Sequence, residues 1–392
     1  MSTSPIARHL PFAVALLTGA MLAACGGSDG GGVTTQPTSG GGSQNCTTDI
    51  YGTMTCTPTG TTFGGAGGGN YVANALVSDT AATNALHHDA NLVNAWGLVF
   101  NPQGYSWVAN AGTATSTLYD GNGVAQSLVV TLAKGNPSGI VFNGTTDFSI
   151  TENAVSGAAP FIFATLQGQI SAWAPAVDGT HSFTIVDNST SGAAYTGLAI
   201  DTGTGGDMIY AADFAKASVD VFSGTFAPVT TAGGFVDATL PAGYAPFGIQ
   251  QIGDKIYVTY AQPDPTTHEK TGAGLGLVDV FDKQGNLLSH LIPAGGVLNA
   301  PWGVALAPAN FGKFSNMLLV GNFGDGKINV FDPTTGAAQG TISTNAGAAI
   351  VTPGLWALQF GNGLNNQPTN TLFYTAGPGA EAHGLYGRID MN

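Results

Sequence analysis

The residues best suited to holding a cation in this sequence are amides and carboxylates that follow short apolar runs. A hard divalent cation such as Ca²⁺ prefers several such oxygen ligands. The candidate ligands are Asn110, Asp213, Asn322 and Glu152. Glu152 lies in an insertion, residues 144 to 160, whose place in the fold the sequence does not define, and the chain has only two other glutamates. A metal-dependent hydrolase is therefore the alternative hypothesis rather than the favoured one.

A larger set of candidate residues is aromatic or carries an amide, and few of its members are charged. If the elements described below form a closed ring, these residues gather at one mouth of its channel. Such a lining suits a glycan, a small molecule or a protein partner better than acid-base hydrolysis. Non-catalytic binding, without a cofactor, is the favoured hypothesis, although Trp96, Trp302 and Trp356 could instead pack between repeating units. The set comprises Asn94, Trp96, Asn110, Asp213, Tyr260, Asn299, Trp302, Asn322, Trp356, Glu381 and His383.

The histidines give two weaker patterns. His87, His88 and Asp89 precede the first repeat, and Glu381 and His383 stand in the last, so ring closure would make them neighbours. Such a cluster could bind a metal or transfer protons, or its hydrogen bonds could simply hold the ring closed. His268, with Glu269 and Lys270 after it, is interpreted as a solvated loop tip.

Charge and missing motifs exclude several functions. The 23 acidic and 9 basic residues give a net charge of −14, which argues against nucleic acid and phosphate-bearing substrates. The sequence has no Gly-x-Ser-x-Gly elbow, no His-Glu-x-x-His motif and no phosphate loop. With 59 glycines and 8% charged residues, the chain is not a long helix or a coiled coil.

The elements that would position these residues come from a sequence repeat. Six segments share a small or polar residue, then usually Gly, then alternating apolar residues. They lie at residues 94–100, 137–142, 195–200, 246–249, 301–306 and 355–360. Further short strands follow most of them, so the spacing predicts a six-bladed β-propeller over residues 70–392. The extra sequence at residues 144–160 and 261–274 predicts loops or small hairpins.

Ring closure is also predicted. The last repeat supplies three strands, near Trp356, Phe373 and Tyr386, and the chain then ends. The strand at residues 71–77 precedes the first repeat and has no other partner. We therefore expect it to complete the last blade and remove an exposed sheet edge.

The turns after the second strands, residues 211–214 and 321–332, resemble NHL repeats. More closely, residues 76–79, 89–97, 195–199, 300–303 and 381–387 resemble a family of uncharacterised bacterial exported propellers. The resemblance covers roughly residues 70 to 391 and implies a six-bladed, NHL-like fold without an established activity. For the alternative hypothesis, gluconolactonase-like propellers, which include lactonases and esterases, hold a divalent cation in the channel.

The N-terminus has the pattern of an export signal. Residues 1–24 carry Arg8 ahead of a short apolar run, and the sequence Leu-Ala-Ala at residues 22–24 precedes Cys25. This pattern resembles the lipobox of bacterial lipoproteins, which implies acylation of Cys25, a membrane anchor and an outer-membrane protein on the periplasmic or cell-surface face.

Residues 25–69 are rich in Gly, Ser and Thr and predict a tether. Cys46 and Cys56 are the remaining cysteines, and their spacing in an exported chain predicts a local disulfide that closes a small hairpin. A metal site at these cysteines is the weaker interpretation, because two ligands do not make a zinc site.

Overall fold

The protein is described by a computed structural model in which residues 44–48, 54–58, 70–81, 83–203, 205–265 and 268–392 are defined. The chain divides into two compact parts, Met1–Thr62 and Phe63–Asn392. Among the defined residues, the only helical elements are two 3-10 turns, η1 (Ser189–Ser191) and η2 (Gly312–Phe314). None of the defined segments is a helix long and apolar enough to span a membrane. The predicted signal, Cys25 and most of the tether lie outside the described residues.

The described residues of the first part form a hairpin of β1 (Gln44–Thr48) and β2 (Met54–Pro58). The antiparallel register places Cys46 directly opposite Cys56. Residues opposite one another in such a pair have Cα atoms about 4.5–5.5 Å apart, which lies within the range that a disulfide spans. The backbone is therefore compatible with the predicted disulfide, and the bond itself stays a prediction.

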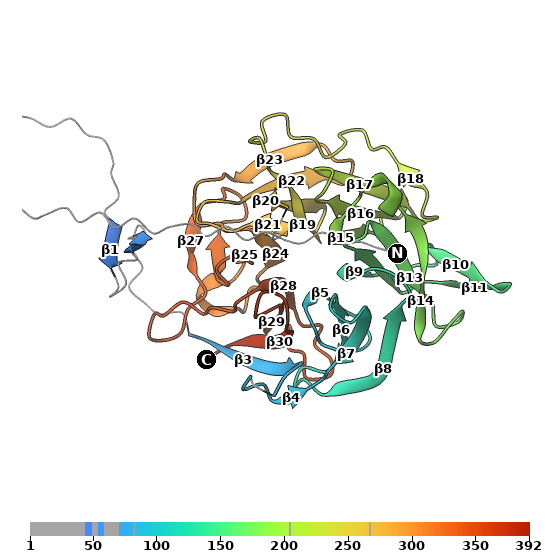
Figure 1. Cartoon of the computed structure of the whole chain (residues 1–392), viewed down its shortest axis with the longest axis horizontal. Coiled ribbons are helices and arrows are strands. Elements are labelled where there is room, and N and C mark those ends of the chain that lie inside the picture. Colours follow the sequence, from blue (N-terminus) through green and yellow to red (C-terminus); the bar gives the residue numbers. More distant parts are fainter. Residues whose placement is uncertain (1–43, 49–53, 59–69, 82, 204, 266–267) are drawn as a thin grey trace, which may run out of the picture. The chain divides into compact units, whose positions relative to one another are not determined.

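The second part is an all-β propeller, as predicted (Figure 1). Its main sheets resolve into six four-stranded antiparallel groups, which we call blades 1 to 6 in chain order. Blades 1 to 3 contain β5 (Ala95–Phe100), β6 (Ser106–Asn110), β7 (Thr115–Tyr119) and β8 (Ala125–Leu132); β9 (Pro137–Phe142), β12 (Phe161–Thr165), β13 (Gln169–Trp173) and β14 (His181–Asp187); and β15 (Tyr195–Asp201), β16 (Met208–Asp213), β17 (Ser218–Ser223) and β18 (Pro228–Val229).

Blades 4 to 6 complete the ring. They contain β19 (Ala245–Ile252), β20 (Lys255–Asp264), β22 (Leu277–Asp282) and β23 (Leu287–Ile292); β24 (Pro301–Leu306), β25 (Leu318–Asn322), β26 (Ile328–Phe331) and β27 (Ala338–Thr341); and β28 (Leu355–Phe360), β29 (Leu372–Ala376), β30 (Leu385–Met391) and β3 (Tyr71–Ser78). Each inner strand contacts the inner strands of both neighbouring blades, and β28 contacts β5, so the ring is closed.

Closure occurs as the sequence predicts. β3 pairs antiparallel with β30 over Tyr71–Ser78, and the two-residue strand β4 (His87–His88) pairs with β3. Blades 1 and 2 are also joined at their outer edges, through a short parallel pairing of β8 with β14. The N-terminal strand therefore leaves blade 6 without an open edge there, which removes a template for pairing with other chains.

Glycine at the inner strands allows the blades to approach closely. A Cβ on Gly248 would overlap the carbonyl oxygen of Trp302 in the next blade, and one on Gly303 would overlap that of Trp356. Hydroxyl groups add hydrogen bonds between blades, as from Thr196 Oγ1 to the Phe247 carbonyl oxygen at 2.7 Å. The repeated Gly in the sequence is thus required by the contact between adjacent inner strands.

A β-bulge recurs where each inner strand meets the second strand of its blade. The register shifts between Ala95 and Leu98 in blade 1, between Pro246 and Gly248 in blade 4, and near the same position in the other blades. A bulge redirects a side chain out of the normal alternation. The residue before the inner-strand Gly lies within or beside this bulge in blades 1 to 5, and Trp356, which precedes Ala357, has the same position in blade 6.

The two insertions form hairpins, as predicted. Residues 144–160 contain β10 (Ser149–Glu152) and β11 (Val155–Ala158), which pair only with each other among the described residues. Residues 261–274 contain the end of β20 and the short β21 (His268–Lys270), which folds back on it. The second hairpin bears directly on the candidate site.

Candidate functional site

Aromatic side chains from four blades meet at the centre of the ring. Trp96 of blade 1 stacks on Trp356 of blade 6 with ring centroids 3.7 Å apart. Phe247 and Trp302 meet the Trp96 ring edge-on, at 6.4 and 6.2 Å. The stacked indoles of Trp96 and Trp356 are 1% and 0% exposed. We call these four residues the aromatic plug, because they fill the channel with rigid apolar surface.

Polar side chains hold the plug in place at the seam of the ring. Asn94 Oδ1 accepts a hydrogen bond from Trp356 Nε1 at 3.2 Å, and Asn94 Nδ2 donates to Glu381 Oε2 at 2.8 Å. Asn94 is 7% exposed and adopts a positive φ of 48°, which Asn tolerates better than most residues. Asn94 and Glu381, both predicted as mouth residues, therefore lie together and orient the plug.

The plug is asymmetric because two blades lack a ring at this position. Blades 2 and 3 carry Ser138 and Thr196, whose hydroxyls donate to carbonyl oxygens of the following blades. A pocket of about 460 Å³ opens beside the plug, over blades 2 to 4. We call it the mouth pocket. It is lined by Trp96, Leu166, Ala194, Thr196, Phe214, Ala215, Phe247, Pro263, Asp264, Pro265 and His268.

The β20–β21 hairpin supplies the polar side of this pocket. Asp264 and His268 lie opposite one another in the hairpin register, and both line the pocket. The prediction of a solvated tip is right for His268 and Lys270, which are exposed, and wrong for Glu269, which is 2% exposed. The burial of Glu269 could not be predicted from the local sequence, because it results from the folding of the hairpin against the mouth.

Glu269 is a buried acid beside the pocket. Burial, together with the negative charges of Glu381 and Asp264, raises the pKa of Glu269 to about 8. The carboxyl group is therefore largely protonated at pH 7. The charge of Glu381 thus affects the pKa of Glu269, although 112 positions separate these two glutamates in the sequence.

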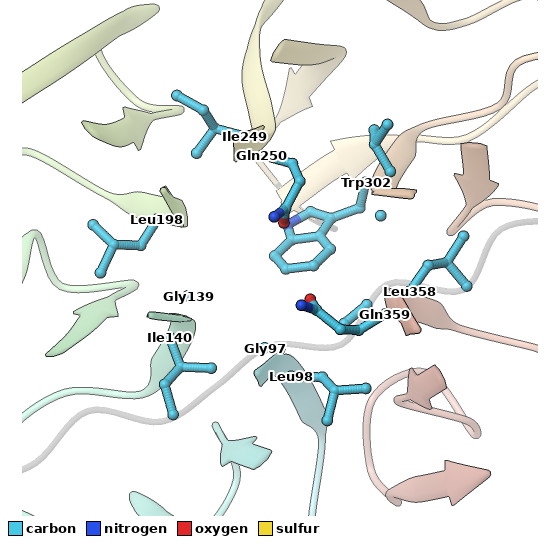
Figure 2. Close-up of a pocket in the computed structure, with 13 residues that line it drawn as sticks. Gly97, Leu98, Gly139, Ile140, Leu198, Ile249, Gln250, Trp302, Leu358 and Gln359 are labelled. Atoms are coloured by element: carbon cyan, nitrogen blue, oxygen red, sulfur yellow. The ribbon is translucent and has the colours of Figure 1, made fainter. Parts of the chain in front are cut away.

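The channel beyond the plug has a different lining. Leu98, Ile140, Leu198 and further aliphatic residues surround it, together with the amides of Gln250 and Gln359. Figure 2 shows the side chains of Gln250, Gln359 and Trp302 projecting toward the middle of this space. The cavity beside Trp302 has a volume of only about 20 Å³, and the adjoining one about 180 Å³. This end offers much less enclosed space than the mouth pocket.

The candidate cation ligands are held separately. Asn110 Nδ2 donates to Thr115 and Thr117, and Asn322 Nδ2 donates to the Val297 carbonyl oxygen and to Asp325. Asp213 Oδ1 accepts from the backbone of Ala194 and of Lys216. These partners belong to the same blade or to the loop beside it.

Glu152 is exposed on β10, in the separate hairpin. Within the described residues, no hydrogen bond joins any two members of the set Asn110, Asp213, Asn322 and Glu152. Asn110, Asp213 and Asn322 are fully buried, and burial raises the pKa of Asp213. The arrangement fixes strand ends within blades.

The remaining predicted residues have structural partners. Asn299 Oδ1 accepts from the Gly272 amide at 2.6 Å, which ties the long β20–β22 connection to the mouth. His383 Nδ1 lies 2.9 Å from Asp79 Oδ2, across the seam between the two chain ends. Asp89 accepts from the Tyr119 hydroxyl instead of joining His383. The seam histidine is thus held by a hydrogen bond that closes the ring.

Sequence reasoning identified Trp96 and Phe247 but missed most other residues of the mouth pocket. Phe214 was available as a signal, because it follows Asp213 at the end of a second strand, as Phe323 follows Asn322. Phe247 was recognised as the residue before an inner-strand Gly. No local pattern marked Leu166, Ala194 or Pro263 as neighbours of these rings.

The sheets, the closed ring and the plugged channel define a β-propeller with a small-molecule-sized pocket at one mouth. The chain is 33% identical over 332 residues to an uncharacterised protein of Acanthamoeba polyphaga mimivirus, covering 81% of this chain and 79% of that protein. A second uncharacterised mimivirus protein is 32% identical over 288 residues, covering 70% and 75%. The chain therefore belongs to the family of these viral proteins. These relatives lend no support to the bacterial and lipoprotein parts of the predicted resemblance.

Solved structures give a more distant likeness. Virginiamycin B lyase from Staphylococcus aureus is 12% identical, with a TM-score of 0.43, over 89% of this chain and 88% of that one. A nidogen/laminin complex is 14% identical, with a TM-score of 0.41, over 67% and 82%. Such likeness carries nothing about activity. No protein-family model matches the chain.

Proposed function

We propose that this propeller binds a small, largely apolar ligand in the mouth pocket, without catalysing its conversion. The observation that carries the proposal is the pocket of about 460 Å³ beside the aromatic plug. Small-molecule sites are concave, mostly apolar and about 300–1,000 Å³ in volume, with a few polar groups that fix orientation. The mouth pocket has each of these properties.

The pocket wall is preorganised. Phe214 packs on Phe247 at a centroid distance of 4.8 Å, and Phe247 contacts Trp96 and Trp356 in the plug. A ligand therefore meets rings that other rings already hold, so little side-chain entropy is lost on binding. The apolar lining favours a hydrocarbon or aromatic body over a glycan.

The polar side of the pocket indicates the head group of the ligand. Asp264 lines the pocket, and the negative charges of Asp264 and Glu381 act on the neighbouring Glu269. A negative potential at this rim attracts a cationic or hydrogen-bond-donating group and repels a carboxylate. We therefore expect an amphipathic amine to bind better than a matched acid.

We further propose that the protein is anchored in a cell envelope through lipid on Cys25, and that its ligand belongs to that compartment. Support comes from the apolar run followed by Leu-Ala-Ala-Cys and from the Gly-rich sequence after it. An acyl chain plus a tether would hold the propeller near the membrane. Replacing Cys25 with Ser should release the protein from the membrane fraction.

The binding proposal is tested with three probes of equal chain length: octylamine, octanol and octanoate. Isothermal titration calorimetry of the full chain should give the order amine, alcohol, acid, with amine and acid separated by about tenfold or more, equivalent to about 1.4 kcal/mol. Ala215→Trp places a large side chain at an exposed lining position and should weaken octylamine binding by about tenfold.

The matched control is Ala125→Trp, at an exposed position on β8 of blade 1 that does not line the pocket. It should bind octylamine as the unmodified protein does. Equal binding by the Ala215→Trp and Ala125→Trp proteins would show that the probe binds elsewhere and would overturn the proposal.

A further inference from the structure

A second cluster of side chains lies on blade 4, away from the plug, and it does not depend on the proposed ligand. Asp279 on β22 and His290 on β23 lie opposite one another in the sheet register, and Asp237 comes from the segment between β18 and β19. His290 Nδ1 is 3.1 Å from Asp279 Oδ1 and 3.4 Å from Asp237 Oδ2. One ligand atom from each residue lies within 4.8 Å of the others.

The two carboxylates are buried while the imidazole reaches solvent. The side chains of Asp237 and Asp279 are 2% and 1% exposed, against 45% for His290. Among the described residues, the salt bridges of these two carboxylates go to His290, and no Lys or Arg pairs with either. Two buried carboxylates beside a single imidazole leave uncompensated negative charge, which is costly in a protein interior.

Asp279 has an unused ligand position. Its Oδ2 is buried and has no hydrogen-bond partner. The hydroxyl of the buried Tyr260 is a polar group beside this carboxyl group. The site therefore has more negative charge than the neighbouring side chains compensate.

A neighbouring hydroxyl orients the imidazole. Thr239 Oγ1 donates to Asp237 Oδ1 at 2.9 Å and lies 2.9 Å from His290 Nε2. Because the hydroxyl proton is used on Asp237, Thr239 Oγ1 is left to accept a proton from Nε2. The Nδ1 atom then faces the two carboxylates, at the place where either a proton or a metal ion would join it to them. Histidine ligands to metals are commonly held in this way, through the ring nitrogen that does not bind the metal.

We propose that Asp237, Asp279 and His290 bind a divalent transition-metal cation such as Zn²⁺. Zinc takes imidazole and carboxylate ligands at about 2.0–2.2 Å, so tetrahedral ligand atoms lie about 3.3–3.6 Å apart. The His290–Asp237 distance of 3.4 Å lies in this range, and the His290–Asp279 distance of 3.1 Å is 0.2 Å below it. The ion would join the segment that contains Asp237 to the outer strands of blade 4.

The test uses the full chain, stripped with chelator and titrated with ZnCl₂ by calorimetry. We expect the unmodified protein to bind about one equivalent of Zn²⁺. The His290→Gln protein should bind no Zn²⁺ at this site, or bind it more than about tenfold more weakly. The matched control is His181→Gln, because His181 Nδ1 also lies 3.2 Å from a carboxylate, Asp178 Oδ1, but on an exposed surface and with one acid only. The His181→Gln protein should bind Zn²⁺ as the unmodified protein does. Both variants keep the three cysteines, so any zinc bound by thiols contributes equally to the two measurements.

Two further readouts keep the result interpretable. Zn²⁺ should raise the thermal midpoint of the unmodified and His181→Gln proteins, but not that of His290→Gln. Thr239→Val, at an exposed position, keeps all three ligands and should weaken Zn²⁺ binding about tenfold by releasing Nε2. The proposal is overturned if the unmodified protein binds no stoichiometric zinc, or if His290→Gln binds it as tightly.

Discussion

The two ends of the channel are built from neighbouring positions of the same repeat, yet they have opposite properties. The residues just before the inner-strand Gly, or before Ala357 in blade 6, form the aromatic plug beside the mouth pocket. Those just after it, such as Leu98, Ile140 and Leu198, surround a narrow aliphatic passage. The bulge at the plug end redirects side chains into the channel. Where it redirects Thr196 instead of a ring, a pocket remains.

Departures from the repeat create the candidate site. The ring needs every blade to pack in the same way, so the repeat determines the fold. The pocket exists because blades 2 and 3 lack a ring at the plug position and because the β20–β21 hairpin of blade 4 supplies part of its wall. Function in a repeated fold lies in such differences.

The largest expected effect comes from removing a ring of the plug. Trp356→Ala should lower the free energy of unfolding by about 3–5 kcal/mol, since the indole is fully buried against Trp96 and Phe323. Urea denaturation followed by circular dichroism measures this change in the free energy of unfolding. Gln359→Ala, on the partly exposed channel side, should cost about 0.5 kcal/mol or less. Equal losses of unfolding free energy for the two variants would contradict the proposed difference between the two ends of the channel.

The next effect concerns pH. The folded pKa of Glu269, about 8, exceeds the ordinary value of 4.5, so the folded state holds the extra proton between these values. The free energy of unfolding should therefore fall as pH rises from about 5 to 8. Glu269→Gln should flatten that slope in thermal melts across this range. A slope unchanged by the substitution would place the titrating group elsewhere.

The smallest effect tests the hydroxyl position beside the pocket. Thr196→Val keeps the shape but removes the hydrogen bond to the Phe247 carbonyl, and it should cost about 1 kcal/mol. Octylamine affinity should change little, because Thr196 would contribute shape rather than a head-group contact. A loss of affinity larger than the loss of stability would assign Thr196 a direct role in binding.

Much of the fold could be predicted because its causes are local or repetitive. Alternating apolar runs, the inner-strand Gly and the missing fourth strand of the last blade led to the propeller and to Tyr71–Ser78 as its closing strand. The amide and tryptophan positions before the inner strands were also found. These features follow from strand periodicity and from the need to satisfy sheet edges.

The site was less predictable because it depends on contacts between distant segments. The sequence predicted Glu269 to be part of a solvated tip. In the structure the hairpin folds against the mouth, and Glu269 is buried near Glu381. Asp279 occupies a polar position that recurs in the third strands, as Thr117, Ser171 and Asn329 do. Only in blade 4 does a histidine lie opposite it. That pairing depends on the sheet register, which shifts at bulges on both sides of Asp279 and could not be predicted from the local pattern.

The most direct test of the central claim is a crystal structure of the protein soaked with 8-bromooctylamine, with the bromine located by anomalous scattering. The bromine should lie in the mouth pocket beside Trp96 and Phe214, with the amine toward Asp264. Bromine in the channel beside Gln250 and Gln359, or no ordered bromine at saturating probe, would contradict the assignment of the binding site to the plugged mouth.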